Sequence, residues 1–158
     1  MQKITPFLWY DGKAEEAVKL YTSIFKNSKV VSLSYWAEGS PFPKGQVMNA
    51  TFELDGQRFY AIDAGPQYKF TEAMSLFVNC ETQEEIDYLW DKLIAGGGKE
   101  SMCGWLKDKF GLSWQIVPSL LGELLGDKDR GKAGRVMQAM LQMKKIIIAD
   151  LRKAYENK

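Results

Sequence analysis

The sequence predicts an α+β fold built from two copies of one unit, in which a strand and a helix are followed by three strands. Strand-like and helix-like periodicities follow each other in the same order in both halves of the 158-residue chain. Each half also ends in a hairpin of two strands. The second hairpin, residues 103–118, is the stretch around which we expect the chain to be organised.

This hairpin is predicted to be two short strands joined by a tight turn at residues 108–111. Alternation in its second strand separates two faces, one with Ser113, Gln115 and Val117 and the other with Trp114 and Ile116. That strand contains no charged residue. Its composition therefore predicts burial on both faces, with one face lining a pocket.

The first half follows the same plan, with a strand at 4–10, a helix at 14–25, a strand at 30–35 and strands at 47–54 and 57–63. The turn pair Asp11-Gly12 ends the first strand, and apolar residues recur at helical spacing from Ala14 to Phe25. The pair Asp55-Gly56 between the last two strands is the strongest short hairpin signal in the chain.

The second half begins with a strand at 74–80, and Thr82 is predicted to cap a helix in which Glu85 completes a capping box. Gly96, Gly97 and Gly98 end that helix, and a short strand near 99–102 precedes the hairpin. The tail adds a short helix at 120–125 and one long helix at 132–157. We expect paired modules over 1–118, divided into about 1–66 and 67–118, and a helical extension over 119–158.

Composition excludes several classes of protein. The 21 basic and 20 acidic residues give a net charge of +1 and form no basic stripe, so no nucleic-acid partner is expected. The longest apolar run, residues 146–149, is too short to span a membrane, and no charged-then-apolar leader opens the chain. These features predict a cytoplasmic protein, in which Cys80 and Cys103 are reduced and buried.

The chain contains no histidine. Histidine is the usual general base near neutral pH and the commonest nitrogen ligand of transition metals. Its absence excludes serine triads, Cys–His pairs and histidine-based metal sites. A site made only of carboxylates stays possible, although nothing is spaced like a calcium loop.

Four segments resemble the PhnB-like family, often labelled 3-demethylubiquinone-9 3-methyltransferase-like, of the vicinal oxygen chelate superfamily: residues 6–12 (PFLWYDG), 14–17 (AEEA), 103–111 (CGWLKDKFG) and 113–118 (SWQIVP). The resemblance covers nearly the whole chain. It implies the glyoxalase/bleomycin resistance fold, with two βαβββ modules that form a curved mixed-sheet cup, here followed by a C-terminal helical extension. The cup of such proteins is usually completed in a homodimer.

In metal-dependent members of the superfamily the ligands come from the first and last strand of each module. By register, the matching positions in this chain are Pro6, Tyr60, Ser75 and Gln115. Neutral groups of this kind do not balance the dehydration of a divalent ion, and proline has no side-chain donor atom. We therefore expect no metal and no cofactor.

The candidate ligand-binding residues are Gln115, Ser75, Tyr60, Trp105, Trp9 and Asp63. Each has a structural alternative. The Gln115 amide either binds a ligand or is satisfied by the backbone or by Ser75. Tyr60 and the tryptophans either wall an apolar site or pack in the core. Asp63 is either a base at the rim of the cup or a cap of the following turn.

Two classes of function stay open at this point. The first is a metal-independent protein that binds an unknown small molecule in a cup shared across a homodimer. The second is an enzyme of unknown reaction, lyase- or isomerase-like, that uses a cup carboxylate or Tyr60 as acid or base. The methyltransferase of the family label carries little weight, because no Gly-x-Gly-x-Gly follows a strand and the implied fold differs from that of such enzymes.

Overall fold

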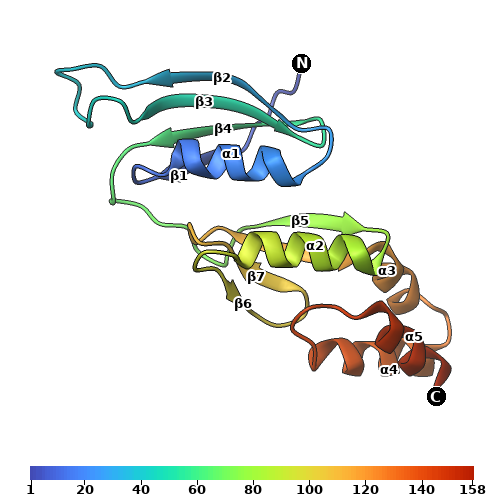
Figure 1. The fold of residues 1–158 in the computed structure, drawn as a ribbon. Helices are drawn as coiled ribbons and strands as arrows, with labels where there is room; N and C mark the ends of the chain where they lie inside the picture. The colour runs from blue at the N-terminus through green and yellow to red at the C-terminus, as the bar shows by residue number, and fades with distance from the viewer. The chain divides into compact units, whose positions relative to one another are not determined.

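The computed structural model describes residues 1–158, which form two compact units, Met1–Phe70 and Thr71–Lys158 (Figure 1). Each unit contains one strand–helix–three-strand module, and the second unit also contains the C-terminal helices. The predicted α+β fold of two βαβββ modules is confirmed.

Unit 1 is a four-stranded sheet with one helix against it. Its elements are β1 (Phe7–Tyr10), α1 (Ala14–Ile24), β2 (Lys29–Tyr35), β3 (Val47–Leu54) and β4 (Gln57–Asp63). The strand order is β1-β4-β3-β2, in which β1 and β4 are parallel and the other pairs are antiparallel. The helix buries its apolar face, which includes Ala17, Val18 and Tyr21. The apolar residues that recur every three or four positions therefore form the face of α1 that packs against the core.

Unit 2 repeats this topology and adds three helices. The module consists of β5 (Ser75–Cys80), α2 (Gln83–Ile94), β6 (Lys99–Glu100), β7 (Trp105–Lys107) and β8 (Ser113–Pro118), and the added helices are α3 (Ser119–Leu125), α4 (Arg130–Leu141) and α5 (Ile148–Glu156). The strand order is β5-β8-β7-β6, with β5 and β8 parallel. The two modules thus share one strand order, as the sequence repeat predicts.

Strand β8 has the predicted alternation. Trp114 and Ile116 are buried, and Gln115 between them is only half-buried. Asp108 fixes the turn before β8, because its Oδ1 accepts hydrogen bonds from the backbone N–H groups of Phe110 and Leu112, and its Oδ2 accepts one from Trp114 Nε1 at 2.9 Å. An aspartate that bonds the backbone two residues ahead is a common turn former.

The prediction of one long helix over 132–157 is wrong. Helix α4 ends at Leu141, residues 142–147 are not helical, and α5 begins at Ile148. The break lets α4 and α5 pack against each other around a small core of Val117, Leu121, Val136, Ile146 and Leu151. We call residues 142–147 the strap.

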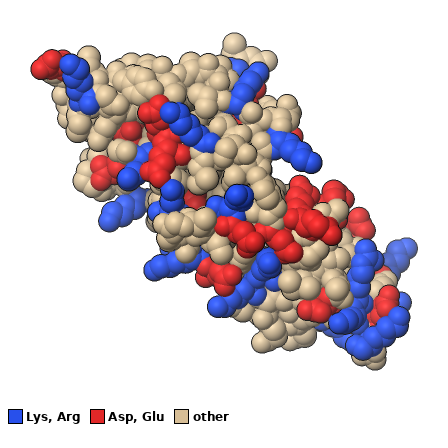
Figure 2. All heavy atoms as spheres, in the orientation of Figure 1, with Lys and Arg blue, Asp and Glu red and all other residues tan.

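The capping box predicted at α2 forms in a modified way. Thr82 Oγ1 accepts the expected hydrogen bond from Glu85 N at 3.2 Å, but the Glu85 carboxylate accepts from Glu81 N rather than Thr82 N. Neither cysteine is in a disulfide; Cys80 is fully buried and Cys103 is half-buried. None of the helices has the length and apolar character that crossing a membrane requires. Figure 2 shows side chains of both charges interspersed over the face it displays.

Candidate functional site

One face of the sheet in unit 2 brings together three of the candidate residues, Gln115, Ser75 and Trp105. Register places Phe77 of β5 and Trp105 of β7 directly opposite Gln115 of β8. Directly opposed side chains on one face of a sheet are near neighbours, with Cβ atoms about 5 Å apart. Gln115 is therefore flanked by two aromatic rings, of which Phe77 is 53% exposed and Trp105 is half-buried. We call this surface the Gln115 face.

The Gln115 amide is satisfied at one end only. Its Nε2 donates a hydrogen bond to Ser75 Oγ at 2.9 Å, whereas its Oε1 has no partner in the protein. The sequence left two roles open for Gln115, and a hydrogen bond to Ser75 belongs to the structural one. This bond orients the amide, and the carbonyl oxygen stays available to accept a hydrogen bond from a ligand.

A second row of side chains crosses the same face two residues earlier along β8. It consists of Ser75, Ser113 and Lys107, which are opposed in register. The Ser113 hydroxyl is buried without a hydrogen-bond partner, which is costly unless a bound molecule or water satisfies it. Lys107 forms an ion pair with Glu72, and this ammonium group lowers the pKa of the Glu72 carboxyl.

The corresponding face of the sheet in unit 1 carries two further candidate residues. Tyr60 lies against Phe7, with ring centroids 5.7 Å apart. Trp9 contacts the edge of Tyr68 at 5.0 Å and donates its Nε1–H to the carbonyl of Gly65 at 2.9 Å. Both Trp9 and Tyr60 are half-buried. We call this surface the Trp9 face.

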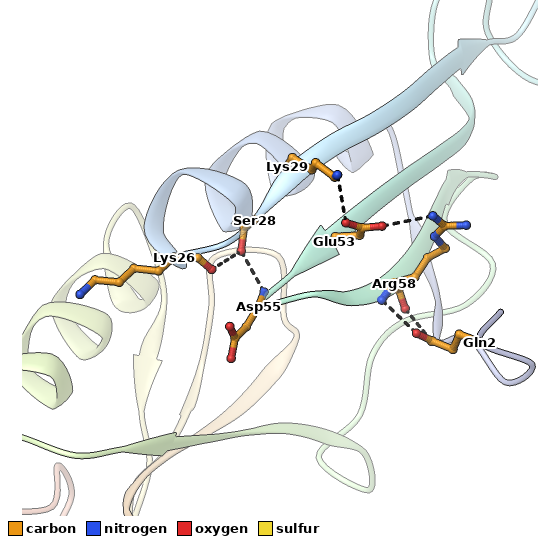
Figure 3. A network of polar contacts seen from close by, with 7 residues as sticks. All are labelled: Gln2, Lys26, Ser28, Lys29, Glu53, Asp55 and Arg58. Carbon is orange, nitrogen blue, oxygen red and sulfur yellow. Dashed lines mark hydrogen bonds and ion pairs between the residues drawn. The ribbon is translucent and has the colours of Figure 1, made fainter.

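A charged network borders the Trp9 face (Figure 3). Glu53 pairs with Arg58 at 3.1 Å and with Lys29 at 3.5 Å. The hydrogen bond from Arg58, followed by the Lys29 charge, holds the pKa of Glu53 below its usual range. Gln2 bonds both the N–H and the carbonyl of Arg58, which attaches the N-terminal segment to β4. The charges are thus paired within the network.

Asp63 lies on the other face of β4, toward α1. It is 2% exposed, and both of its oxygens accept hydrogen bonds at 2.9 Å, Oδ1 from Ala14 N and Oδ2 from Val47 N. A carboxylate at a helix N-terminus satisfies a free N–H group and interacts favourably with the helix dipole. Lys13, which precedes α1, offers no side-chain cap, so a residue 49 positions away supplies it. This geometry is that of a structural carboxylate.

The extension holds the turn that leads into Trp105. The N–H groups of Cys103 and Gly104 donate to the carbonyls of Met143 and Lys144 in the strap, both at 2.8 Å. The carbonyl of Gly104 in turn accepts from Ile116 N at 2.8 Å. The strap is therefore bonded to the segment that joins β6 to β7, and β7 is the strand on one side of Gln115.

Gln83 at the start of α2 anchors the strap from the other side. Its Oε1 accepts from Ile148 N at 2.8 Å, and its Nε2 donates to the carbonyl of Ile146 at 3.0 Å. Lys145 also pairs with Asp87 at 2.9 Å, and the hydrogen bond from Lys145 lowers the pKa of Asp87. Val117, the next residue on the Gln115 face, packs in the core of the extension. The extension therefore borders the candidate site.

The four positions matched to metal ligands lie in two adjacent pairs. Tyr60 N donates to the carbonyl of Pro6 at 2.9 Å, and Gln115 bonds Ser75. The pairing differs by one residue between the modules, because Tyr60 is opposite Phe7, next to Pro6, whereas Gln115 is opposite Phe77, two residues from Ser75. No three His, Cys, Asp or Glu side chains converge as a metal site would require, and the donors at the four matched positions are neutral.

Two residues of the site escaped the sequence analysis. Phe77 shares the face of Ser75 by simple alternation in β5, and that signal was available. Asp108 is the first residue of the predicted turn, but its bond to Trp114 Nε1 depends on the tertiary fold.

The model of the family described as 3-demethylubiquinone-9 3-methyltransferase matches residues 2–117. The chain belongs to this PhnB-like family. The match ends one residue before β8 does, so the helical extension lies outside the family model. No curated protein matches the chain.

Solved structures of several proteins have the same fold. A putative 3-demethylubiquinone-9 3-methyltransferase, the PhnB protein of Bacillus cereus, is 46% identical with a TM-score of 0.71, and the match covers 75% of this chain and 100% of that one. Protein PA1353 of Pseudomonas aeruginosa is 22% identical with a TM-score of 0.63, over 75% and 98% of the two chains. The fosfomycin resistance protein FosX of Listeria monocytogenes is 11% identical with a TM-score of 0.53, over 78% and 97%. The last two similarities concern the fold alone.

Proposed function

We propose that this PhnB-like protein binds a small, partly apolar molecule without a metal, and that the ligand lies on the Gln115 face. The observation that carries the proposal is the Gln115 amide between Phe77 and Trp105, which Ser75 orients at one end and which is free at the other. A binding site of this kind combines apolar walls with a few placed polar groups. The Ser75 hydroxyl, which accepts from the Gln115 amide and is half-buried, supplies a second polar group.

The metal-free part of the proposal rests on the chemistry of the donors. The chain has no histidine, and Pro6, Tyr60, Ser75 and Gln115 stand at the positions matched to the superfamily's ligands. Elemental analysis of protein purified without chelator tests it. Close to one zinc, nickel, iron or manganese per chain would contradict the proposal.

We further propose that the protein is a homodimer. Large apolar side chains such as Phe7, Met74 and Phe77 are more than half exposed. Large apolar side chains exposed in this way can be covered at an interface between two chains. Light scattering should return twice the chain mass of 18.0 kDa, and a mass near that of one chain would contradict the dimer.

The alternative functions have less support. An enzyme that used Asp63 as a base would need a free carboxylate, but both Asp63 oxygens accept backbone hydrogen bonds. A methyltransferase, which the family description names, would need a cofactor site. The three consecutive glycines of this chain follow α2 rather than a strand, so they do not form a glycine-rich phosphate loop.

The substitution Gln115→Leu tests the binding proposal. It keeps similar bulk and removes both polar atoms. A compound found by a fluorescence screen against the wild type should lose roughly tenfold to a hundredfold in affinity, the equivalent of one or two hydrogen bonds. Gln57→Leu, at an exposed glutamine of β4 in unit 1, is the matched control and should leave affinity unchanged.

A purely structural role of Gln115 predicts a different result. If Gln115 is only a packing partner of Ser75, Gln115→Leu should lower the free energy of unfolding by about 1–3 kcal/mol and leave the affinity for the compound as it was. That outcome would remove the proposed binding residue.

A further inference from the structure

An open depression of about 510 Å³ lies on the surface of the helical extension between α4 and α5, and four of its nine lining residues are cationic. We call this depression the cavity. Arg130 and Arg135 of α4 contribute to it, together with Lys153 and Lys158, and no carboxylate lines it. In Figure 2, several Lys and Arg side chains lie in the region where Figure 1 places α4 and α5, with acidic side chains among them.

The guanidinium of Arg135 is fixed in place. Its Nε donates to the carbonyl of Ala154 at 2.9 Å and its Nη2 to that of Tyr155 at 2.8 Å, at the C-terminal end of α5. These bonds hold a half-buried cation without a carboxylate partner. Its Nη1 is directed toward Gly131, since a Cβ atom built on Gly131 would lie 3.8 Å from it. Nη1 therefore keeps its donors for a ligand.

Neither arginine forms a direct ion pair with a carboxylate, although the charge of Arg130 contributes to lowering the pKa of Asp127. Arg130 donates only to the carbonyls of Leu125 and Asp127, at 3.3 Å. The Asp129 carboxylate caps α4 by accepting from the N–H groups of Gly131 and Lys132. It is not a lining residue, but it lies beside the cavity, since its Oδ1 would be 3.2 Å from a Cβ atom built on Gly131. The two lysines pair with exposed carboxylates, Lys153 with Asp150 and Lys158 with Glu156.

Glycines keep this wall of the cavity open. Gly131 and Gly134 are one turn apart on α4 and both line it. A Cβ atom at Gly134 would meet no atom within 4 Å. A ligand can therefore approach the helix backbone between the arginines.

We propose that this cavity binds the phosphate group of a phosphorylated small molecule. Guanidinium groups match the geometry of phosphate oxygens, and a pre-oriented guanidinium loses little entropy when it binds one. The cavity leaves space beyond the phosphate for an organic part of the ligand. The site lies outside the family model and shares no residue with the Gln115 face, so it does not depend on the function proposed above.

The test uses the full chain and inorganic phosphate, titrated at constant ionic strength against sodium chloride and followed by amide NMR. Saturable shifts should appear at Gly131 and Gly134. The variant Gly134→Glu places a carboxylate in the cavity and should weaken phosphate binding by about tenfold or more, through like-charge repulsion. The open space at Gly134 and the gain in helix propensity mean that this variant should fold.

Two control variants separate charge repulsion inside the cavity from the effects of added bulk and of net charge. Gly134→Gln adds the same bulk without charge and should retain most of the binding. Gly122→Glu changes net charge equally at another open glycine, on α3, and should bind phosphate like the wild type. Tighter binding of phenyl phosphate than of inorganic phosphate would support an organic ligand; equal binding would assign the cavity to the phosphate group alone.

Two results would overturn the proposal. One is the absence of a saturable shift at both glycines of the wild type. The other is equal weakening in Gly134→Glu and Gly122→Glu, since that would reflect only the net charge of the chain.

Discussion

Asp63, the last residue of β4, caps α1: its carboxylate accepts a hydrogen bond from the backbone N–H of Ala14 at 2.9 Å. The same carboxylate accepts from Val47 N, so one buried side chain joins the start of a helix to the start of β3. Asp63 therefore links β4 to the first residues of both α1 and β3.

Replacing this carboxylate should destabilise unit 1. In Asp63→Asn, one of the two acceptor oxygens becomes a donor that faces an N–H group, and the charge at the helix N-terminus is lost. We expect the free energy of unfolding to fall by about 1–3 kcal/mol in urea denaturation. Asp55→Asn, in the exposed turn of the hairpin, should stay within about 0.5 kcal/mol of the wild type. Equal effects in the two variants would contradict the capping role.

The hairpin turn itself shows why much of the fold was predictable. Asp55 and Gly56 both have positive φ, 47° and 79°, as their residue types favour. The strands on either side have the predicted bounds. Local preferences and tertiary structure agree here, so the sequence alone is sufficient.

The strap shows where local pattern fails. Met143 and Ile147 continue the helical spacing of α4, but the carbonyls of Met143 and Lys144 bind the turn at Cys103 and Gly104 instead of helical N–H groups. Three consecutive isoleucines from 146 to 148 also have lower helix propensity than unbranched residues. The competing partner is 40 residues away, so no local pattern reveals it. The same holds for the cap that Asp63 supplies to Ala14.

Gln83 should hold the extension in place. Gln83→Ala leaves Ile148 N and the carbonyl of Ile146 without their partners, and we expect a loss of about 1–3 kcal/mol. Hydrogen exchange should become faster at Ile148 and leave the strands of unit 1 unchanged. Gln142→Ala removes an exposed glutamine of the strap whose side chain makes no hydrogen bond, and it should have little effect. If exchange at Ile148 stays slow in Gln83→Ala, the anchor lies elsewhere.

The two cysteines should differ in reactivity. Burial, together with the charges of Glu85 and Glu81, raises the pKa of the Cys80 thiol to about 12. This thiol therefore stays protonated and inaccessible, whereas Cys103 is partly exposed. Iodoacetamide at mildly alkaline pH should modify Cys103 alone in the folded protein, and both residues after denaturation. Mass spectrometry that found Cys80 labelled as fast as Cys103 would contradict the buried position.

The extension should lose stability in acid. Tyr155 Oη donates to Asp127 Oδ2 at 2.6 Å, and this bond, followed by one from Asp129 N, holds the pKa of Asp127 below its usual range. A carboxyl whose pKa is lowered by folding stabilises the fold above its ordinary pKa, and that contribution disappears as the pH falls through the folded value.

Tyr155→Phe tests this linkage. The pKa of Asp127, followed by NMR of its carboxyl group, should rise toward the ordinary value, and the acid sensitivity of the extension should decrease. Tyr88→Phe, on the exposed side of α2, is the control. An unchanged Asp127 titration in Tyr155→Phe would show that the backbone bond alone sets its pKa.

The attachment of the strap also bears on how far this arrangement can diverge in sequence. Its bonds to Cys103 and Gly104 run from backbone to backbone, so they tolerate almost any side chain at residues 143 and 144. Cys103 has a φ of 59°, which disfavours β-branched side chains at that position. Gly104 is different: its φ is +84°, and a Cβ atom there would lie 2.9 Å from the carbonyl oxygen of Ile116 and 3.1 Å from Ile146 Cγ1. Among related chains, the strap can therefore vary in sequence and stay bonded to this turn, whereas the turn itself requires glycine at position 104 and restricts the residue before it.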